Sequence, residues 1–164
     1  MTNTAVQTPT IVDQQQLLDH WQGHRNLTRK MIEIFPEDKL FTFSVGGMRP
    51  FSEFILEFLG MAVPGLNGLL TKEWNHFEEL KGDKKPTTKK QLLAIWDEAT
   101  QQINEIFPKI PASRFSEVDT AFGQWEGTGR YFLFYFIDNE IHHRGQAYVY
   151  LRGLGIEPPG FWER

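Results

Sequence analysis

The 164-residue sequence predicts an all-α protein, a four-helix bundle in a single domain. Two observations carry this prediction: four long segments place their apolar residues at helical spacing, and no segment alternates apolar and polar residues as a half-buried strand does. The composition, with 40% hydrophobic and 23% charged residues, is typical of one domain with a sizeable core. We therefore expect functional side chains to lie between facing helices.

The first two helices are expected within residues 12–35 and from residue 51 to about residue 74. Asp13 is placed to cap the first helix, and Pro36 ends it because proline cannot continue a helix. The pair Pro64-Gly65 is expected to kink or interrupt the second helix. The stripe of the first helix consists of Leu17, Leu18, Trp21, Thr28, Met31, Ile32 and Phe35.

The third and fourth helices are expected after residue 86. Thr87 or Thr88 caps the third helix, which stops before Pro108, and the last helix runs from about Thr128 to Leu154. Three segments are expected to lack regular structure: a polar tail at 1–10, an exposed linker at 81–86 and an irregular stretch at 112–127. Together the helices would form one domain over residues 1–164.

The charge balance and the missing cysteines exclude several kinds of function. A net charge of −4 and a pI near 5.7 disfavour non-specific electrostatic binding to nucleic acid. Without cysteine, the chain has no disulfide, thiolate metal site or cysteine nucleophile. The N-terminus lacks signal-peptide features, and no uninterrupted apolar run approaches the roughly 20 residues that span a bilayer. These observations predict a cytoplasmic protein with no nucleic-acid and no membrane partner.

A polar pair lies on the apolar stripe of the last predicted helix. His143 is part of that stripe, and Asn139 lies one turn back on the same side. The apolar members are Phe132, Phe136, Ala147, Tyr150 and Leu154. Burying polar groups is costly unless they find partners. The pair is therefore either a satisfied part of the core or a ligand pair, in which His143 binds strongly and the Asn139 carbonyl suits harder cations.

Other polar residues on the predicted helices also leave alternatives open. Glu57 is bracketed by two phenylalanines and a methionine, so it is either a boundary residue facing water or a metal ligand and base. His20 and His24 stand four apart, a spacing at which two imidazoles can share a metal, but only His24 falls within the apolar stripe. Glu140 and Arg144 are expected to form an intrahelical ion pair.

The sequence around His143 resembles that of a known family. The run DNEIHHRGQ at 138–146, followed by YLR at 150–152 and LG at 154–155, is similar to the C-terminal signature of the DinB-like superfamily. That superfamily includes YfiT-type metal-dependent hydrolases and bacterial S-transferases for low-molecular-weight thiols. RPF at 49–51, leading into LEF at 56–58, resembles the start of the family's second helix, so the resemblance covers most of the chain.

The resemblance implies a four-helix bundle, a homodimer and a divalent metal. The family holds that metal with one histidine of the second helix and a His-x-x-x-His pair of the last helix. Here these positions carry Glu57, Asn139 and His143, so one of the three histidines remains, and His24 would complete a different set. Among Zn, Ni, Mn and Fe, a set richer in oxygen shifts the preference towards harder ions.

The first function that fits these expectations is a metal-dependent transferase or hydrolase acting on a small molecule. His143 and Glu57 would hold the metal, assisted by Asn139 or His24, and the metal would lower the pKa of a bound thiol or water. Aromatic walls would receive the substrate; the candidates are Trp125, Tyr131 and Tyr135.

Two further functions remain open. One is a non-catalytic, stress-linked dimeric binding module, in which the polar residues form a hydrogen-bonded core network. The other is metal-free acid–base catalysis by Glu57 and His143, which requires both groups within hydrogen-bond reach of one substrate. Near the C-terminus, the rings of Phe161 and Trp162 need cover, either on the chain's own surface or on a partner.

Overall fold

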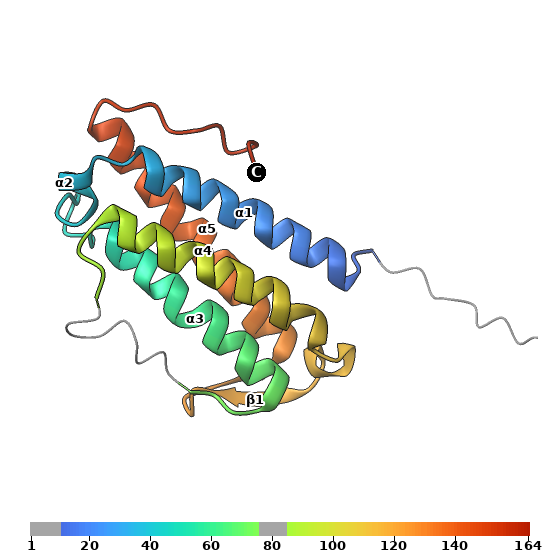
Figure 1. The fold of residues 1–164 in the computed structure, drawn as a ribbon. Coiled ribbons are helices and arrows are strands. Elements are labelled where there is room, and N and C mark those ends of the chain that lie inside the picture. Colours follow the sequence, from blue (N-terminus) through green and yellow to red (C-terminus); the bar gives the residue numbers. More distant parts are fainter. Residues whose placement is uncertain (1–10, 76–84) are drawn as a thin grey trace, which may run out of the picture.

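Four long helices form the protein, as the sequence predicts. The computed structural model describes residues 11–75 and 85–164, with α1 at Gln14–Ile34, α3 at Phe51–Thr71, α4 at Lys89–Ile106 and α5 at Gly129–Gly153 (Figure 1). Shorter elements join them: α2 at Glu37–Leu40, 3₁₀ turns at Phe107–Lys109 and Ala112–Phe115, and strands β1 at Val118–Ala121 and β2 at Trp125–Thr128. The predicted tail at 1–10 and most of the predicted linker at 81–86 lie outside the described residues.

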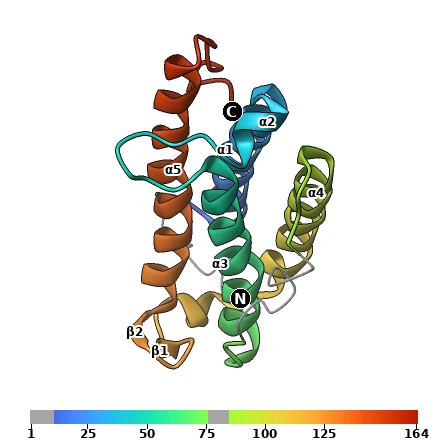
Figure 2. The ribbon, with the colours of Figure 1, turned by 90° about the vertical axis from the view of Figure 1, so that its left-hand side faces the viewer.

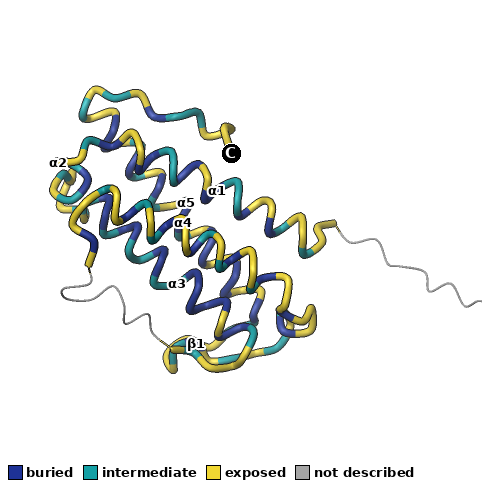
Figure 3. Tube along the Cα trace, in the orientation of Figure 1, coloured by how far each residue is buried: buried dark blue, intermediate teal, exposed yellow. Residues whose placement is uncertain are grey.

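The helices pack as a bundle in which α3 and α1 each contact both α4 and α5. The helices α3 and α5 run in opposite directions, and Figure 2 shows them side by side, with the hairpin of β1 and β2 at one end. Buried residues follow the inward faces of all four helices (Figure 3). This arrangement places facing side chains of α3 and α5 on one side of the molecule.

Two helix starts are fixed by the residues that the sequence indicates. Asp13 accepts a hydrogen bond from the backbone N–H of Gln16, and the Gln16 side chain accepts one from the Asp13 backbone. Thr88 and Gln91 form the same reciprocal arrangement at the start of α4. Each such cap stabilises its helix by about 1 kcal/mol, because it satisfies backbone donors that lack an intrahelical partner.

Pro64 does not interrupt α3, so the interruption that was one of the two expected outcomes does not occur. The helix continues through Pro64 to Thr71, three residues short of the predicted end at Trp74. Both Pro64 and Gly65 are buried, and an added Cβ at Gly65 would lie 2.3 Å from ring carbons of Phe136. Tertiary packing therefore outweighs the lost backbone hydrogen bond, and the glycine is required by the close approach of α5.

The stretch at 112–127 is not irregular, which corrects a second expectation. Strand β1 pairs with β2 in antiparallel register, from Val118 opposite Thr128 to Ala121 opposite Trp125. Gly123 turns the chain with a φ of 69°. Of β1, only Ala121 is buried, so four residues give too short an alternation of apolar and polar side chains to be recognised in the sequence.

Helix α3 is apolar because it is the central packing element. Among the described residues, α3 is the one helix long and apolar enough to cross a membrane by length and composition, although 61% of its most apolar window is buried inside the bundle. Its buried residues pack towards α4 and α5. The composition of α3 is thus accounted for by its place in the core.

Candidate functional site

Glu57 on α3 faces two polar residues of α5. Asn139 Nδ2 donates a hydrogen bond to Glu57 Oε1 over 2.9 Å, and His143 Nε2 lies 3.4 Å from the same oxygen. Arg49 Nη2 donates to Glu57 Oε2 over 2.5 Å. The structure thus brings together three predicted site residues and adds an arginine. We call Arg49, Glu57, Asn139, His143 and Gln146 the Glu57 centre.

Local structure positions each member of the Glu57 centre. Asn139 and His143 are four residues apart on α5, so both side chains project from the same face one turn apart. Arg49 ends the loop before α3, and Tyr150 Oη anchors this loop by donating to the Arg49 carbonyl over 2.9 Å. The sequence signal for Arg49 was its place at the start of the family-like segment at 49–51, although its pairing with Glu57 was not expected.

The imidazole ring of His143 is fixed by a hydrogen bond at one nitrogen and by stacking on one face. Its Nδ1 lies 2.8 Å from Gln146 Oε1, an acceptor, so Nδ1 carries the proton of this hydrogen bond. The ring of Phe54 stacks on the imidazole, with centroids 4.5 Å apart and an interplanar angle of 11°. This environment fixes the direction of Nε2 towards Glu57, because one nitrogen and one face of the ring are already in use.

The electrostatics of the Glu57 centre favour an ionised carboxylate. Desolvation by burial raises the pKa of Glu57, but hydrogen bonds from Asn139 and Arg49 and the positive charges of Arg49 and His143 together lower it below its ordinary value. The side chain of Glu57 is 27% exposed and that of His143 is 15% exposed. The carboxylate accepts hydrogen bonds from Asn139 and Arg49, and its remaining lone pairs can accept a further donor from a ligand.

The residues of the Glu57 centre do not fit a tightly held divalent ion. Asn139 presents its amide nitrogen, a donor, to the carboxylate, and Arg49 already supplies a positive charge to the other oxygen. One imidazole and one carboxylate remain as strong donors. Over residues 11–75 and 85–164, no group of three or more His, Cys, Asp or Glu side chains is arranged to hold a metal. Structural zinc sites usually have four protein ligands and catalytic zinc sites three.

His24, the fourth predicted site residue, belongs to a different cluster. Arg144 Nη2 lies 2.9 Å from His24 Nδ1, and an arginine can only donate, so Nδ1 holds the lone pair of this ring. In the neutral ring Nε2 then carries the proton, and it lies 3.2 Å from His20 Nε2. The one lone pair of His24 is therefore occupied by Arg144, and a metal at His24 would have to displace that contact.

Burial keeps His24 uncharged. Desolvation, together with the positive charges of Arg144, His20 and Arg164, lowers the pKa of His24 from 6.5 to about 4. The side chain is almost fully buried, and Arg164 Nη1 lies 3.3 Å from Nε2, a longer contact than the 2.9 Å of Arg144 at Nδ1, so the lone pair is assigned to Nδ1. His24 is thus a neutral hydrogen-bonding group in the core between α1 and α5.

Sequence reasoning missed a buried charged cluster beside His24. Glu140 and Arg144 form the expected intrahelical ion pair, but their residues are only 1% and 5% exposed, so the pair is buried. Thr28 Oγ1 donates to Glu140 Oε1 over 2.5 Å, and Arg25 and Arg144 lie 3.9 and 3.8 Å from the Glu140 oxygens. We call Arg25, Thr28, Glu140 and Arg144 the buried ion cluster.

The helical spacing of these residues in the sequence could have predicted the buried ion cluster. Glu140 and Arg144 lie on the stripe of α5 formed by Leu133, Ile137, Ala147 and Leu151, all of them buried. On α1, Arg25 continues the stripe of Leu18, Trp21, Thr28 and Ile32. Arg25 also stacks on Trp96, with its Cζ 3.8 Å from the ring centroid. Charged residues on apolar stripes thus indicated a core ion pair between α1 and α5.

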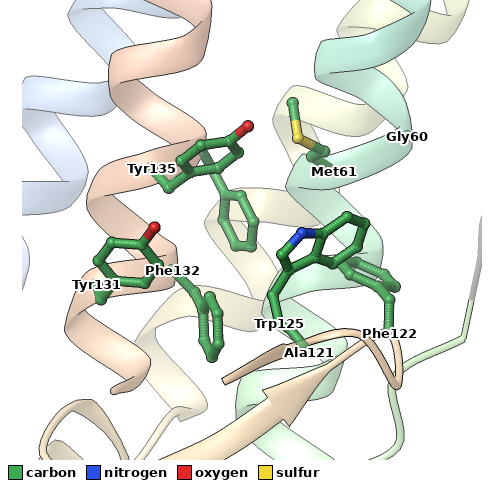
Figure 4. A pocket seen from close by; sticks show the side chains of 9 residues that line it. Gly60, Met61, Ala121, Phe122, Trp125, Tyr131, Phe132 and Tyr135 are labelled. Carbon is green, nitrogen blue, oxygen red and sulfur yellow. The ribbon is translucent and has the colours of Figure 1, made fainter. Parts of the chain in front are cut away.

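An aromatic pocket opens beside the Glu57 centre. It has a volume of about 340 Å³ and lies between α3, α5 and the hairpin (Figure 4). Its lining consists of Gly60, Met61, Ala121, Phe122, Trp125, Tyr131, Phe132, Tyr135 and Phe136. Trp125, Tyr131 and Tyr135, which the sequence suggested as aromatic walls, are all among these residues. This volume falls at the lower end of the usual range for small-molecule pockets, about 300–1,000 Å³.

The pocket and the Glu57 centre occupy the same side of the bundle. Met61 follows Glu57 by four residues on α3, and Tyr135 precedes Asn139 by four residues on α5. Because α3 and α5 run in opposite directions, both steps lead towards the hairpin end (Figure 1). One helical turn, about 5.4 Å along the axis, thus separates the polar groups from the pocket lining on each helix. We call this combined region the α3–α5 face.

The fold and the polar side chains between its facing helices place this protein in the class of four-helix bundles. Comparison with known proteins then shows its family. The DinB family model matches residues 52–164, well over half of the chain. The chain therefore belongs to the DinB family, as the signature at 138–146 indicated.

The relatives of the chain agree with this assignment. Uncharacterized protein YjoA of Bacillus subtilis (strain 168) is 25% identical over 149 residues, which cover 91% of this chain and 96% of that protein. The crystal structure of that DinB-like protein superposes with a TM-score of 0.73 at 20% identity, covering 89% of this chain and 97% of its own. A DinB-like protein from Bacillus cereus ATCC 10987 gives a TM-score of 0.69 at 19% identity, with 89% and 95% covered. These structures support the fold.

Proposed function

We propose that this DinB-family protein binds a small molecule at the α3–α5 face and that the Glu57 centre works without a tightly held metal. The observation that carries the proposal is the pairing of Glu57 with Arg49, Asn139 and His143, one helical turn from an aromatic pocket. A pocket with apolar walls and a few convergent polar groups is the usual form of a small-molecule site.

Arg49 has the central role in the metal-free form of this centre. Its guanidinium neutralises the carboxylate that would otherwise attract a cation, and it also approaches the ring of Phe54 to 5.0 Å. Asn139 Oδ1 is buried and, within the described part of the chain, has no hydrogen-bond partner. This oxygen is an acceptor that a water or a ligand hydroxyl would satisfy.

Metal analysis of the tag-free protein tests the proposal. We expect much less than one equivalent of Zn, Ni, Mn or Fe per purified chain, and no heat of stoichiometric binding when Zn²⁺ is titrated into it. Arg49→Ala is expected to increase the affinity for Zn²⁺, because Glu57 then lacks its positive partner. His142→Ala, at an exposed neighbouring imidazole, serves as the control. One equivalent of metal in the wild-type protein, lost in His143→Ala, would overturn the proposal and support a metal-dependent enzyme.

A second function, metal-free acid–base catalysis, is favoured by one distance. Glu57 Oε1 and His143 Nε2 lie 3.4 Å apart, so one substrate proton can be shared by both groups. In the transfer of a small thiol to an aromatic halide, this pair would take the thiol proton, sulfur would bond to the ring carbon and halide would leave. The test is the rate of product formation from 1-chloro-2,4-dinitrobenzene and N-acetylcysteine across pH 5 to 9. A rate unchanged in Glu57→Gln and His143→Ala would exclude this function.

A further inference from the structure

The lining of the aromatic pocket is unusual in its chemistry. Six of its nine residues have aromatic rings, and none carries a charge. Its polar groups are the Tyr131 and Tyr135 hydroxyls and the Trp125 indole nitrogen. Figure 4 shows the nitrogen of Trp125 on the side of its ring that faces the two tyrosines. The pocket therefore combines apolar walls with a small number of neutral hydrogen-bonding groups at its rim.

The rings at the rim of the pocket remain accessible to solvent. Trp125, Tyr131 and Tyr135 are 54%, 57% and 49% exposed. Large aromatic residues that stay exposed together on one face commonly mark a binding site, because burying them would be favourable. They come from two separate elements, α5 and β2, so the hairpin holds Trp125 across from the tyrosines of α5 (Figure 4).

Gly60 provides the space at the α3 side of the pocket. A Cβ added at Gly60 would have no other heavy atom within 4 Å, and this position is an ordinary helical one. The buried rings of Phe132 and Phe136 also line the pocket. The missing side chain thus leaves room for a ligand between α3 and the rings of the hairpin and α5.

The absence of charge in the lining decides between two kinds of ligand that aromatic rings recognise. A quaternary ammonium binds ring faces through cation–π attraction. A neutral ring system binds them by stacking and edge-to-face contact. Among the nine lining residues there is no carboxylate to balance a desolvated cation. The chemistry of the lining therefore favours the neutral ring.

We propose that the aromatic pocket binds a flat, uncharged fused-ring molecule that carries a hydroxyl or carbonyl group at its edge. The rings of Trp125, Tyr131 and Tyr135 cover its faces and edges, and the polar group of the ligand lies at the rim. This inference names the ligand class for the proposed function and rests on it. The two remain separable, because Gly60 and Trp125 belong to the pocket and Glu57 belongs to the polar centre.

Calorimetric titration with three matched probes tests the ligand class. The probes are 2-naphthol, its saturated analogue decahydro-2-naphthol, and choline. We expect 2-naphthol to bind one site per chain at least tenfold more tightly than either of the others. Gly60→Leu, which fills the pocket from a position with free space, is expected to weaken 2-naphthol binding at least tenfold, and Trp125→Ala likewise. Thermal unfolding of each variant verifies that the fold is kept.

Trp162→Ala is the matched control, because Trp162 is also an exposed tryptophan, 71% accessible, but lies in the C-terminal segment outside the pocket lining. Its affinity for 2-naphthol should stay within twofold of wild type. Equal binding of the saturated analogue, tighter binding of choline, loss of binding in the control, or no binding of any probe would each overturn the proposed ligand class. If ring binding fails while the wild-type protein remains metal-free and Arg49→Ala gains Zn²⁺ affinity, the Glu57 centre stands without this ligand.

Discussion

Glu57 and Glu140 are carboxylates in two different surroundings of the same bundle. Glu57 is partly exposed and accepts hydrogen bonds from Arg49 and Asn139. Glu140 is 1% exposed and is enclosed by Thr28, Arg25 and Arg144. The accessibility of Glu57 supports its proposed role in ligand binding, whereas the burial of Glu140 indicates a structural role.

Removing the charge of Glu140 should destabilise the bundle. Glu140→Gln leaves Arg25 and Arg144 buried without a negative partner, and we expect the free energy of unfolding to fall by about 3 kcal/mol. Urea denaturation measures this change. The control is Glu33→Gln, which removes an exposed ion-pair partner of Arg29 and should cost less than about 1 kcal/mol. Equal effects of the two substitutions would show that the buried ion cluster contributes no more than a surface pair.

Stability should also depend on pH through His24. The pKa of His24 is lowered from 6.5 in the unfolded chain to about 4 in the fold, so the unfolded state binds more protons between these values. The contribution of His24 is fully present above pH 6.5 and is lost as the pH falls towards 4. We expect a loss of about 2 kcal/mol between pH 7 and pH 5 from this residue.

The variant His24→Gln isolates this contribution. Chemical denaturation at pH 7 and pH 5 should show a smaller pH effect in His24→Gln than in wild type, whereas His142→Gln, at an exposed position, should keep the wild-type effect. A wild-type stability that is constant over this interval, or a pH effect kept in full in His24→Gln, would contradict the assignment of a neutral, buried imidazole.

At the scale of elements, α3 and α5 touch closely because Gly65 lacks a side chain. Gly65→Ala places a Cβ 2.3 Å from ring carbons of the buried Phe136, and the resulting displacement should cost about 1–3 kcal/mol. Gly60→Ala, five residues earlier on the same helix, meets no atom within 4 Å and should instead stabilise the protein by about 0.5–1 kcal/mol. Thermal unfolding of both variants measures these changes. Equal shifts in Tm would contradict the close packing of Gly65 against Phe136.

The four long helices were predictable because each repeats one signal over many residues. Asp13 and Thr88 marked two starts correctly, since a cap combines a side-chain type with a position before an apolar stripe. The interruption expected at Pro64 did not occur, because local propensity cannot show that α3 is buried on several sides. The hairpin was missed because two strands of four residues give too few alternations to be recognised.

The candidate site was predictable in part for the same physical reason. Helical spacing places Asn139 and His143 on one face, and the apolar surroundings of Glu57 mark it as unusual. The pairing of Arg49 with Glu57 depends on the path of a loop, which periodicity does not determine. His24 shares its inward orientation with the Glu57 centre, but orientation on one helix does not specify which neighbouring helix it meets.

At the scale of the whole molecule, the bundle separates two polar regions. The buried ion cluster joins α1 to α5, while the Glu57 centre joins α3 to α5 and borders the aromatic pocket. The helix α5 contributes to both, with Glu140 and Arg144 on one face and Asn139 and His143 on another. Because polar residues lie on two of its faces, α5 is less clearly amphipathic than a helix with one apolar face and one polar face.

The homodimer implied by the sequence stays a prediction. Phe161 and Trp162 are 67% and 71% exposed and contact each other edge to face, so the chain's own surface leaves them largely uncovered. A dimer of the 19.1 kDa chain has a mass of about 38 kDa, which light scattering after size-exclusion chromatography would detect. A mass equal to one chain at all concentrations tested would contradict the dimer.

We propose that the Glu57 centre and the aromatic pocket form one binding site. A titration of ¹⁵N-labelled protein with 2-naphthol, followed by ¹H–¹⁵N NMR, tests it most directly. We predict that the indole N–H of Trp125 and the side-chain amide of Asn139 shift together and saturate with the same Kd, while signals around His24 stay in place. Shifts at Trp125 without any at Asn139, or shifts centred on α1, would contradict a single site on the α3–α5 face.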